Sequence, residues 1–126
     1  MNRTKIGIAG FDKKKEKKLK LQFKKISFIQ LNKKNFFNSK DLDAIVVFTE
    51  GGLSNCIDSF FLHKKYKYFS NLKWFHLSRA GVEEYSGEFK KINFLLTCGK
   101  IIQGPNVSEH CLALLLYLSR GLKFVN

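Results

Sequence analysis

Short apolar runs alternate with polar, lysine-rich segments along the chain. The runs are rich in β-branched and aromatic residues, as strands are, and they cover residues 5–11, 26–31, 44–49, 73–78 and 92–97. The third run is continuously apolar, which predicts a central parallel strand covered on both faces. Strands separated by helical segments predict an open, parallel α/β sheet of the flavodoxin-like kind, with helices on both faces.

The segments between the apolar runs carry helix signals. Asp12 can cap a lysine-rich helix that ends near Phe23, because its carboxylate can accept a hydrogen bond from a first-turn amide. A second helix is expected from about Ser54 to Tyr66. The polar connection at 32–40 carries two phenylalanines that are expected to pack on the sheet.

The last predicted helix is unusually apolar. Ser108 is its expected N-cap, its end is expected near Arg120, and Pro105, the only proline, is expected to precede it. A single domain usually buries one face of a terminal helix, so apolar residues on most sides predict a second subunit or domain packed against helix 108–120. A helix at the centre of its own domain is the alternative. The apolar positions are Val107, Cys111, Leu112, Ala113, Leu114, Leu115, Leu116, Tyr117, Leu118 and Leu122.

Length and charge limit the classes of protein to which the chain can belong. The 126 residues are enough for one domain, and they contain no run of eighteen apolar residues, so no membrane span is expected. The N-terminus lacks a signal-peptide pattern, so a cytoplasmic location is expected. The net charge of +13 comes from lysines spread along the chain, which indicates a solvated surface and weak, sequence-independent binding of nucleic acid rather than a specific nucleic-acid partner.

The cysteines do not suggest a metal or redox site. Cys56, Cys98 and Cys111 are widely spaced and form no C-x-x-C pair. We expect reduced core thiols and no bound metal.

Two loops at the ligand-binding edge of the expected sheet carry glycines. Ligands of open α/β sheets bind beyond the carboxyl ends of the strands. In the loop after the fourth strand, Gly81 would let successive amides of Ala80, Gly81 and Val82 point at an anion, and Arg79 would clamp a carboxylate. Gly51 marks a second such tip after the third strand. The alternative is that both glycines only permit turns and that Arg79 lies on the surface.

Two longer segments, 72–83 (LKWFHLSRAGVE) and 104–120 (GPNVSEHCLALLLYLSR), resemble the D-isomer-specific 2-hydroxyacid dehydrogenases. That family has approximately L-K-W-I-x-x-x-x-A-G-V-D/E followed by V-A-E-H-x-L-A-L-L-L-A-L-A-R. The glyoxylate/hydroxypyruvate reductase-like branch is the most similar. The strand pattern extends the resemblance over nearly the whole chain, although residues 12–43 match in pattern alone.

The resemblance implies that residues 1–126 are the substrate-binding domain of an NAD(P)-dependent oxidoreductase. The turn amides of Ala80, Gly81 and Val82 would then hold the carboxylate of a small 2-oxo or 2-hydroxy acid. Val107 would lie near the nicotinamide and so contact the cofactor, and helix 108–120 would lie at the interface of a homodimer.

Several features of the family have no counterpart in the chain. Its catalytic arginine, glutamate and histidine find no match, and the first strand, at Gly7–Asp12, lacks the G-x-G-x-x-G order. NAD or NADP would therefore be held by a Rossmann domain outside these residues, the substrate domain would be incomplete, and no catalytic residue is assigned. The competing interpretations are a non-catalytic module that binds carboxylates or dimerises, and a basic nucleic-acid-binding protein.

Overall fold

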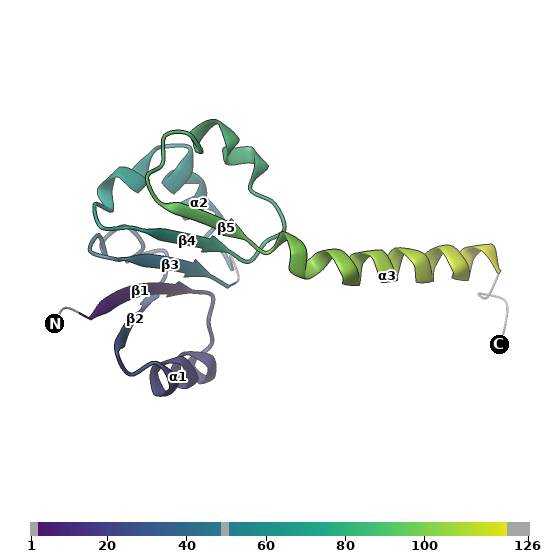
Figure 1. Cartoon of the computed structure of the whole chain (residues 1–126), viewed down its shortest axis with the longest axis horizontal. Helices are drawn as coiled ribbons and strands as arrows, with labels where there is room; N and C mark the ends of the chain where they lie inside the picture. Colours follow the sequence, from purple (N-terminus) through teal and green to yellow (C-terminus); the bar gives the residue numbers. More distant parts are fainter. Residues whose placement is uncertain (1–2, 49–50, 121–126) are drawn as a thin grey trace.

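A computed structural model describes residues 3–48 and 51–120, apart from the side chains of residues 101–103. Five parallel strands form an open sheet in the order β2-β1-β3-β4-β5 with interleaved helices (Figure 1), which confirms the predicted flavodoxin-like α/β fold. The strands are β1 Thr4–Ala9, β2 Ile26–Leu31, β3 Ala44–Val47, β4 Trp74–Leu77 and β5 Leu95–Cys98.

Three strand boundaries differ from the prediction by two or more residues. β1 ends at Ala9 because Gly10 takes a left-handed φ of 74°, which turns the chain out of the sheet. β3 ends at Val47, and the predicted end at Thr49 lies outside the described residues. β5 begins at Leu95 rather than Ile92, because the chain still follows a turn at 88–92.

Helix α1, Lys13–Gln22, lies on one face of the sheet (Figure 1) and begins as predicted. The Asp12 carboxylate accepts a hydrogen bond from the backbone N–H of Lys15 at 2.7 Å. This bond satisfies one of the amides that a helix start leaves without a partner.

The opposite face is covered by α2 and two short 3₁₀ helices. α2, Ser54–Phe61, is shorter than the predicted helix, because Lys64 adopts a left-handed φ of 55° that breaks the helical path. The chain then forms η1, Lys65–Tyr68, and, after β4, η2, Glu83–Glu88.

The core lies between α2 and the sheet and is dominated by aromatic rings. The Phe60 ring is fully buried, with centroids 4.6 Å from Phe75 and 5.4 Å from Phe69. Phe36, one of the two phenylalanines predicted to pack, is also fully buried. Burial of one such side chain contributes about 1.5–3 kcal/mol, so this face of the sheet fixes the fold.

The other face of the sheet is covered less evenly. Val46 of β3 is only half-buried and Leu95 of β5 is exposed, so the prediction that β3 is covered on both faces holds in part. On the same face, Thr97 accepts a hydrogen bond from Trp74 Nε1 at 2.9 Å and lies 2.8 Å from His76 Nδ1.

Helix α3, Lys100–Ser119, follows β5 and extends away from the sheet (Figure 1). The predicted start at Ser108 is wrong: the helix begins eight residues earlier and Pro105 lies inside it, so Glu109 is not in the first turn. Gly104 explains the continuity, because it has no Cβ to clash with the proline ring and so can stay helical before it. The Ser108 hydroxyl donates to the Gly104 carbonyl at 2.9 Å instead of capping the helix.

The described part of α3 is fully in contact with solvent. Every residue from 104 to 120 is exposed, including the apolar ones that predicted a packing partner. Among the described residues, no helix combines the length and the apolar content needed to cross a bilayer.

Candidate functional site

The loop after β4 lies at the carboxyl edge of the sheet, held between the loops of its two neighbours. The Ser78 N–H donates to Val47 O at 3.0 Å, on the side of β3. On the side of β5, the Gly99 N–H donates to Arg79 O at 2.9 Å and Cys98 Sγ lies 3.6 Å from Ala80 O. Backbone bonds from both sides therefore fix the path of this turn.

Gly99 is a positioning residue that the sequence analysis missed. A Cβ at this position would lie 3.0 Å from the Ser78 carbonyl carbon and closer still to its oxygen. Backbone atoms cannot yield as the end of a side chain can, so a residue without a Cβ is needed for β5 to pass this close to the turn. A single glycine between a strand and a helix gives no such signal in a sequence.

The turn already carries a carboxylate, that of Glu83. Its Oε2 lies over Gly81, where the Cβ of any other residue would be. The pKa of Glu83 is lowered first by its own backbone N–H, then by Lys100, whose Nζ lies 3.3 Å from Oε1, and also by the backbone N–H of Val82. The amides that face an anion are thus those of Val82 and Glu83, at the end of the predicted Ala80–Val82 segment.

The Arg79 guanidinium is directed to acidic and aromatic neighbours in η2. It forms an ion pair with Glu84 and lies 5.0 Å from the centroid of the Tyr85 ring. The pKa of Glu84 is lowered, first by the nearby Tyr85 hydroxyl and then by Arg79. A ligand carboxylate would have to compete with Glu84 for this arginine.

Tyr85 ties the loop to the core. Its side chain is 1% exposed, its ring stacks on Phe61 with centroids 4.5 Å apart, and its hydroxyl donates to Asp58 Oδ1 at 2.7 Å. Burial, followed by the hydrogen bond to Asp58, raises the pKa of Tyr85 far above its ordinary value. The turn is therefore anchored at both ends, by Gly99 and by Tyr85.

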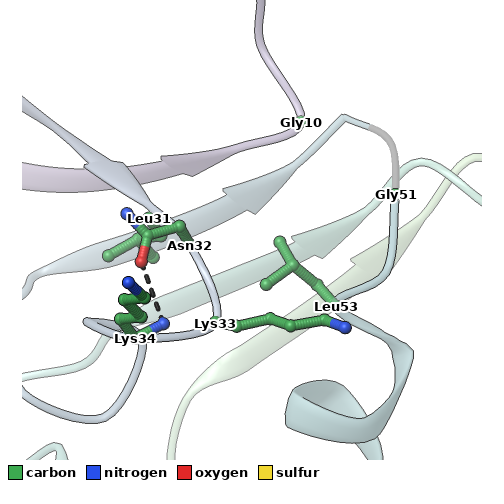
Figure 2. A pocket seen from close by; sticks show the side chains of 7 residues that line it. All are labelled: Gly10, Leu31, Asn32, Lys33, Lys34, Gly51 and Leu53. Carbon is green, nitrogen blue, oxygen red and sulfur yellow. Dashed lines mark hydrogen bonds between the residues drawn. The ribbon is translucent and has the colours of Figure 1, made fainter.

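The other two predicted contacts lie elsewhere. Gly51 lines a cavity between the loops that follow β1, β2 and β3 (Figure 2), and none of residues 79–82 lines that cavity. Val107 lies on α3, is 59% exposed, and is seven residues, or about 10 Å of helix rise, beyond Lys100. Gly51 therefore belongs to a cavity that residues 79–82 do not line, and Val107 lies well along α3 from the turn.

The described residues do not fit a dinucleotide at the first βα unit. Helix N-termini bind pyrophosphate through amides that no other anion occupies. Here the Asp12 carboxylate already accepts from the Lys15 amide at the start of α1, and its charge would repel a phosphate. Among the described residues, no three histidines, cysteines or carboxylates lie close enough to hold a metal ion.

The cysteines differ from the prediction in their environment. All three are free thiols, but Cys111 is exposed on α3, and Cys56 and Cys98 are only half-buried. The prediction of core thiols therefore holds for Cys56, which packs against the core, and is wrong for Cys111, because α3 leaves the sheet instead of packing on it.

Comparisons with protein-family models, curated proteins and solved structures found no match.

Proposed function

We propose that the turn at 79–83 binds the carboxylate of a small 2-oxo or 2-hydroxy acid. In this proposal the chain is the substrate-binding portion of a D-2-hydroxyacid dehydrogenase, and NAD or NADP is bound outside the residues described. The observation that carries the proposal is the position of the Glu83 carboxylate, which lies over Gly81 and interacts with the backbone N–H groups of Val82 and Glu83. A backbone turn that accommodates one carboxylate has the donors that another requires.

The surroundings of the turn support a small anionic ligand. Lys100, at the start of α3, adds a positive charge beside the turn, since its ammonium lies 3.3 Å from the Glu83 carboxylate. Both of these side chains are mostly exposed, so their ion pair is weak and a ligand can displace it. The net charge of +13 favours the approach of any small acid.

A second candidate function, a dimerisation module, is favoured by a different observation. The described part of α3 is exposed along its whole length and carries large apolar side chains, a surface that monomeric proteins seldom leave in water. The two candidate functions are compatible, because the turn at 79–83 lies beside Lys100, at the start of α3, whereas the exposed apolar residues lie further along that helix.

The proposal is tested by following backbone amides in an NMR titration of the full chain. Glyoxylate should shift the amides of Val82 and Glu83 at millimolar concentrations, whereas glycolaldehyde, which lacks the carboxylate, should not. Gly81→Ala places a methyl group where the carboxylate lies and should abolish the shifts. Gly87→Ala is the matched control, because a Cβ there meets no other atom within 4 Å.

A third variant tests the role of the internal carboxylate. Glu83→Gln removes the competing charge from the turn and should increase the affinity for glyoxylate several-fold. The proposal is wrong if glyoxylate leaves the two amides unchanged in both the wild-type chain and Glu83→Gln, or if Gly81→Ala and Gly87→Ala respond alike.

A further inference from the structure

The cavity that contains Gly51 lies at the point where the strand order of the sheet reverses. In the order β2-β1-β3-β4-β5, the chain passes from β1 outward to β2 and then returns to the other side of β1 as β3. The loops after β1 and β3 therefore diverge, and open α/β sheets bind ligands in the crevice this creates. The cavity of about 530 Å³ lies there, between Gly10 after β1 and Gly51 after β3.

Two lysines and two leucines give this cavity its chemistry. Figure 2 shows Lys33 extended from the loop after β2 toward Leu53, across the cavity, whereas Lys34 leaves the same loop toward Leu31 and Asn32. The Lys33 Nζ would lie 3.6 Å from a Cβ at Gly52, where φ is +84°. Leu31 and Leu53 line the base of the cavity and are almost fully buried. The cavity thus carries two positive charges over an apolar base.

The loop that carries the lysines is held by its own side chains. Asn32 Oδ1 accepts from the backbone N–H of Lys34 at 2.9 Å and of Asn35 at 3.1 Å. In return, Asn35 Oδ1 accepts from the Asn32 N–H at 2.7 Å, and its Nδ2 donates to Gln30 O at 2.9 Å. This network fixes the backbone from which both lysines project, so little backbone ordering is needed when a ligand binds.

From these features we propose that the cavity binds a small phosphate monoester, with the phosphate at Lys33, which crosses the cavity, and with Lys34 adding positive charge from the same loop. Lysine binds phosphate as a compact charge, and two lysines match the two negative charges of a phosphate monoester. The volume lies within the range of about 300–1,000 Å³ typical of small-molecule sites. This site is separate from the turn at 79–83 and does not depend on its function.

The test uses ribose 5-phosphate and the full chain, with ribose as the ligand control. Ribose 5-phosphate should shift the amides of Gly10, Lys33, Lys34 and Gly51, and ribose should not. Lys33→Gln with Lys34→Gln should weaken binding about tenfold or more, because both charge-assisted contacts are lost. The control, Lys24→Gln with Lys25→Gln, removes the same charge from two consecutive exposed lysines just before β2, at the other end of that strand. It should change the affinity less than about twofold, because salt screens charges that lie far from the ligand.

Three outcomes would overturn the proposal. One is the absence of shifts at Gly10, Lys33, Lys34 and Gly51 with ribose 5-phosphate. The second is an equal loss of affinity in the two double variants, which would mean that the net charge alone attracts the phosphate. The third is a single-stranded oligonucleotide that binds the same amides more tightly and displaces ribose 5-phosphate. Glyoxylate binding at Val82 and Glu83 is read from other amides in the same spectra, so failure here and failure of the proposed function are distinguishable.

Discussion

The exposed helix α3 predicts that the chain associates with a second copy of itself. Leu112 and Leu116 lie one turn apart on this helix and are 56% and 49% exposed. Full burial of a leucine contributes about 1.5–3 kcal/mol, so burying the remaining half of each side chain contributes about 1 kcal/mol. Two residues in each of two copies then contribute about 4 kcal/mol to a dimer, which corresponds to about a thousandfold in Kd.

Replacement of both leucines by glutamate should remove this contribution and leave the fold intact. Neither side chain belongs to the core, so Leu112→Glu with Leu116→Glu should weaken association about a thousandfold or more, and the desolvation of two carboxylates adds to the effect. Sedimentation velocity over a range of concentrations measures the association, and circular dichroism checks the fold.

A control with the same charge and spacing is available on the same helix. Asn106→Glu with His110→Glu also adds two carboxylates one turn apart, but on polar positions about a third of a turn around the helix. This variant should associate like the wild-type chain. A wild-type chain that stays monomeric at high concentration would refute the reasoning, and so would an unfolded Leu112→Glu with Leu116→Glu variant, since both leucines would then have to be core residues.

Two further predictions concern the anchors of the turn at 79–83. Tyr85→Phe should lower the free energy of unfolding by about 0.5–1.5 kcal/mol at neutral pH through loss of the bond to Asp58. The pKa of Tyr85 is raised in the folded chain, so the contribution of Tyr85 to the free energy of unfolding is present below about pH 10 and is lost as the pH rises further. The free energy of unfolding of Tyr85→Phe, measured with urea, should therefore depend less on pH above about 10 than that of the wild-type chain. Gly99→Ala should cost about 1–3 kcal/mol in thermal unfolding, and equal stability of the variant would contradict the close approach to Ser78.

The elements that local patterns determine could be predicted from the sequence. The apolar runs place all five strands, and Asp12 marks the start of α1, because strand composition and helix capping involve neighbouring residues. The predictions fail where one residue overrides the pattern. Lys64 ends α2 early through a left-handed φ, and Gly104 lets α3 continue through Pro105. A side chain rarely adopts the first conformation and proline usually forbids the second, so neither departure is visible in the pattern.

The candidate site could be predicted only as a turn, because its chemistry depends on residues far away in the sequence. The segment from Arg79 to Val82 identifies a glycine turn, but the position of the Glu83 carboxylate also depends on Lys100, seventeen residues later. Lys100 is near the turn because Gly99 lets β5 end against Arg79, which no local pattern encodes. In the same way, Lys33 extends across to the loop after β3 only because the sheet places β2 and β3 on either side of β1. Both anion sites thus combine a short motif that can be read from the sequence with a charge that only the folded sheet supplies.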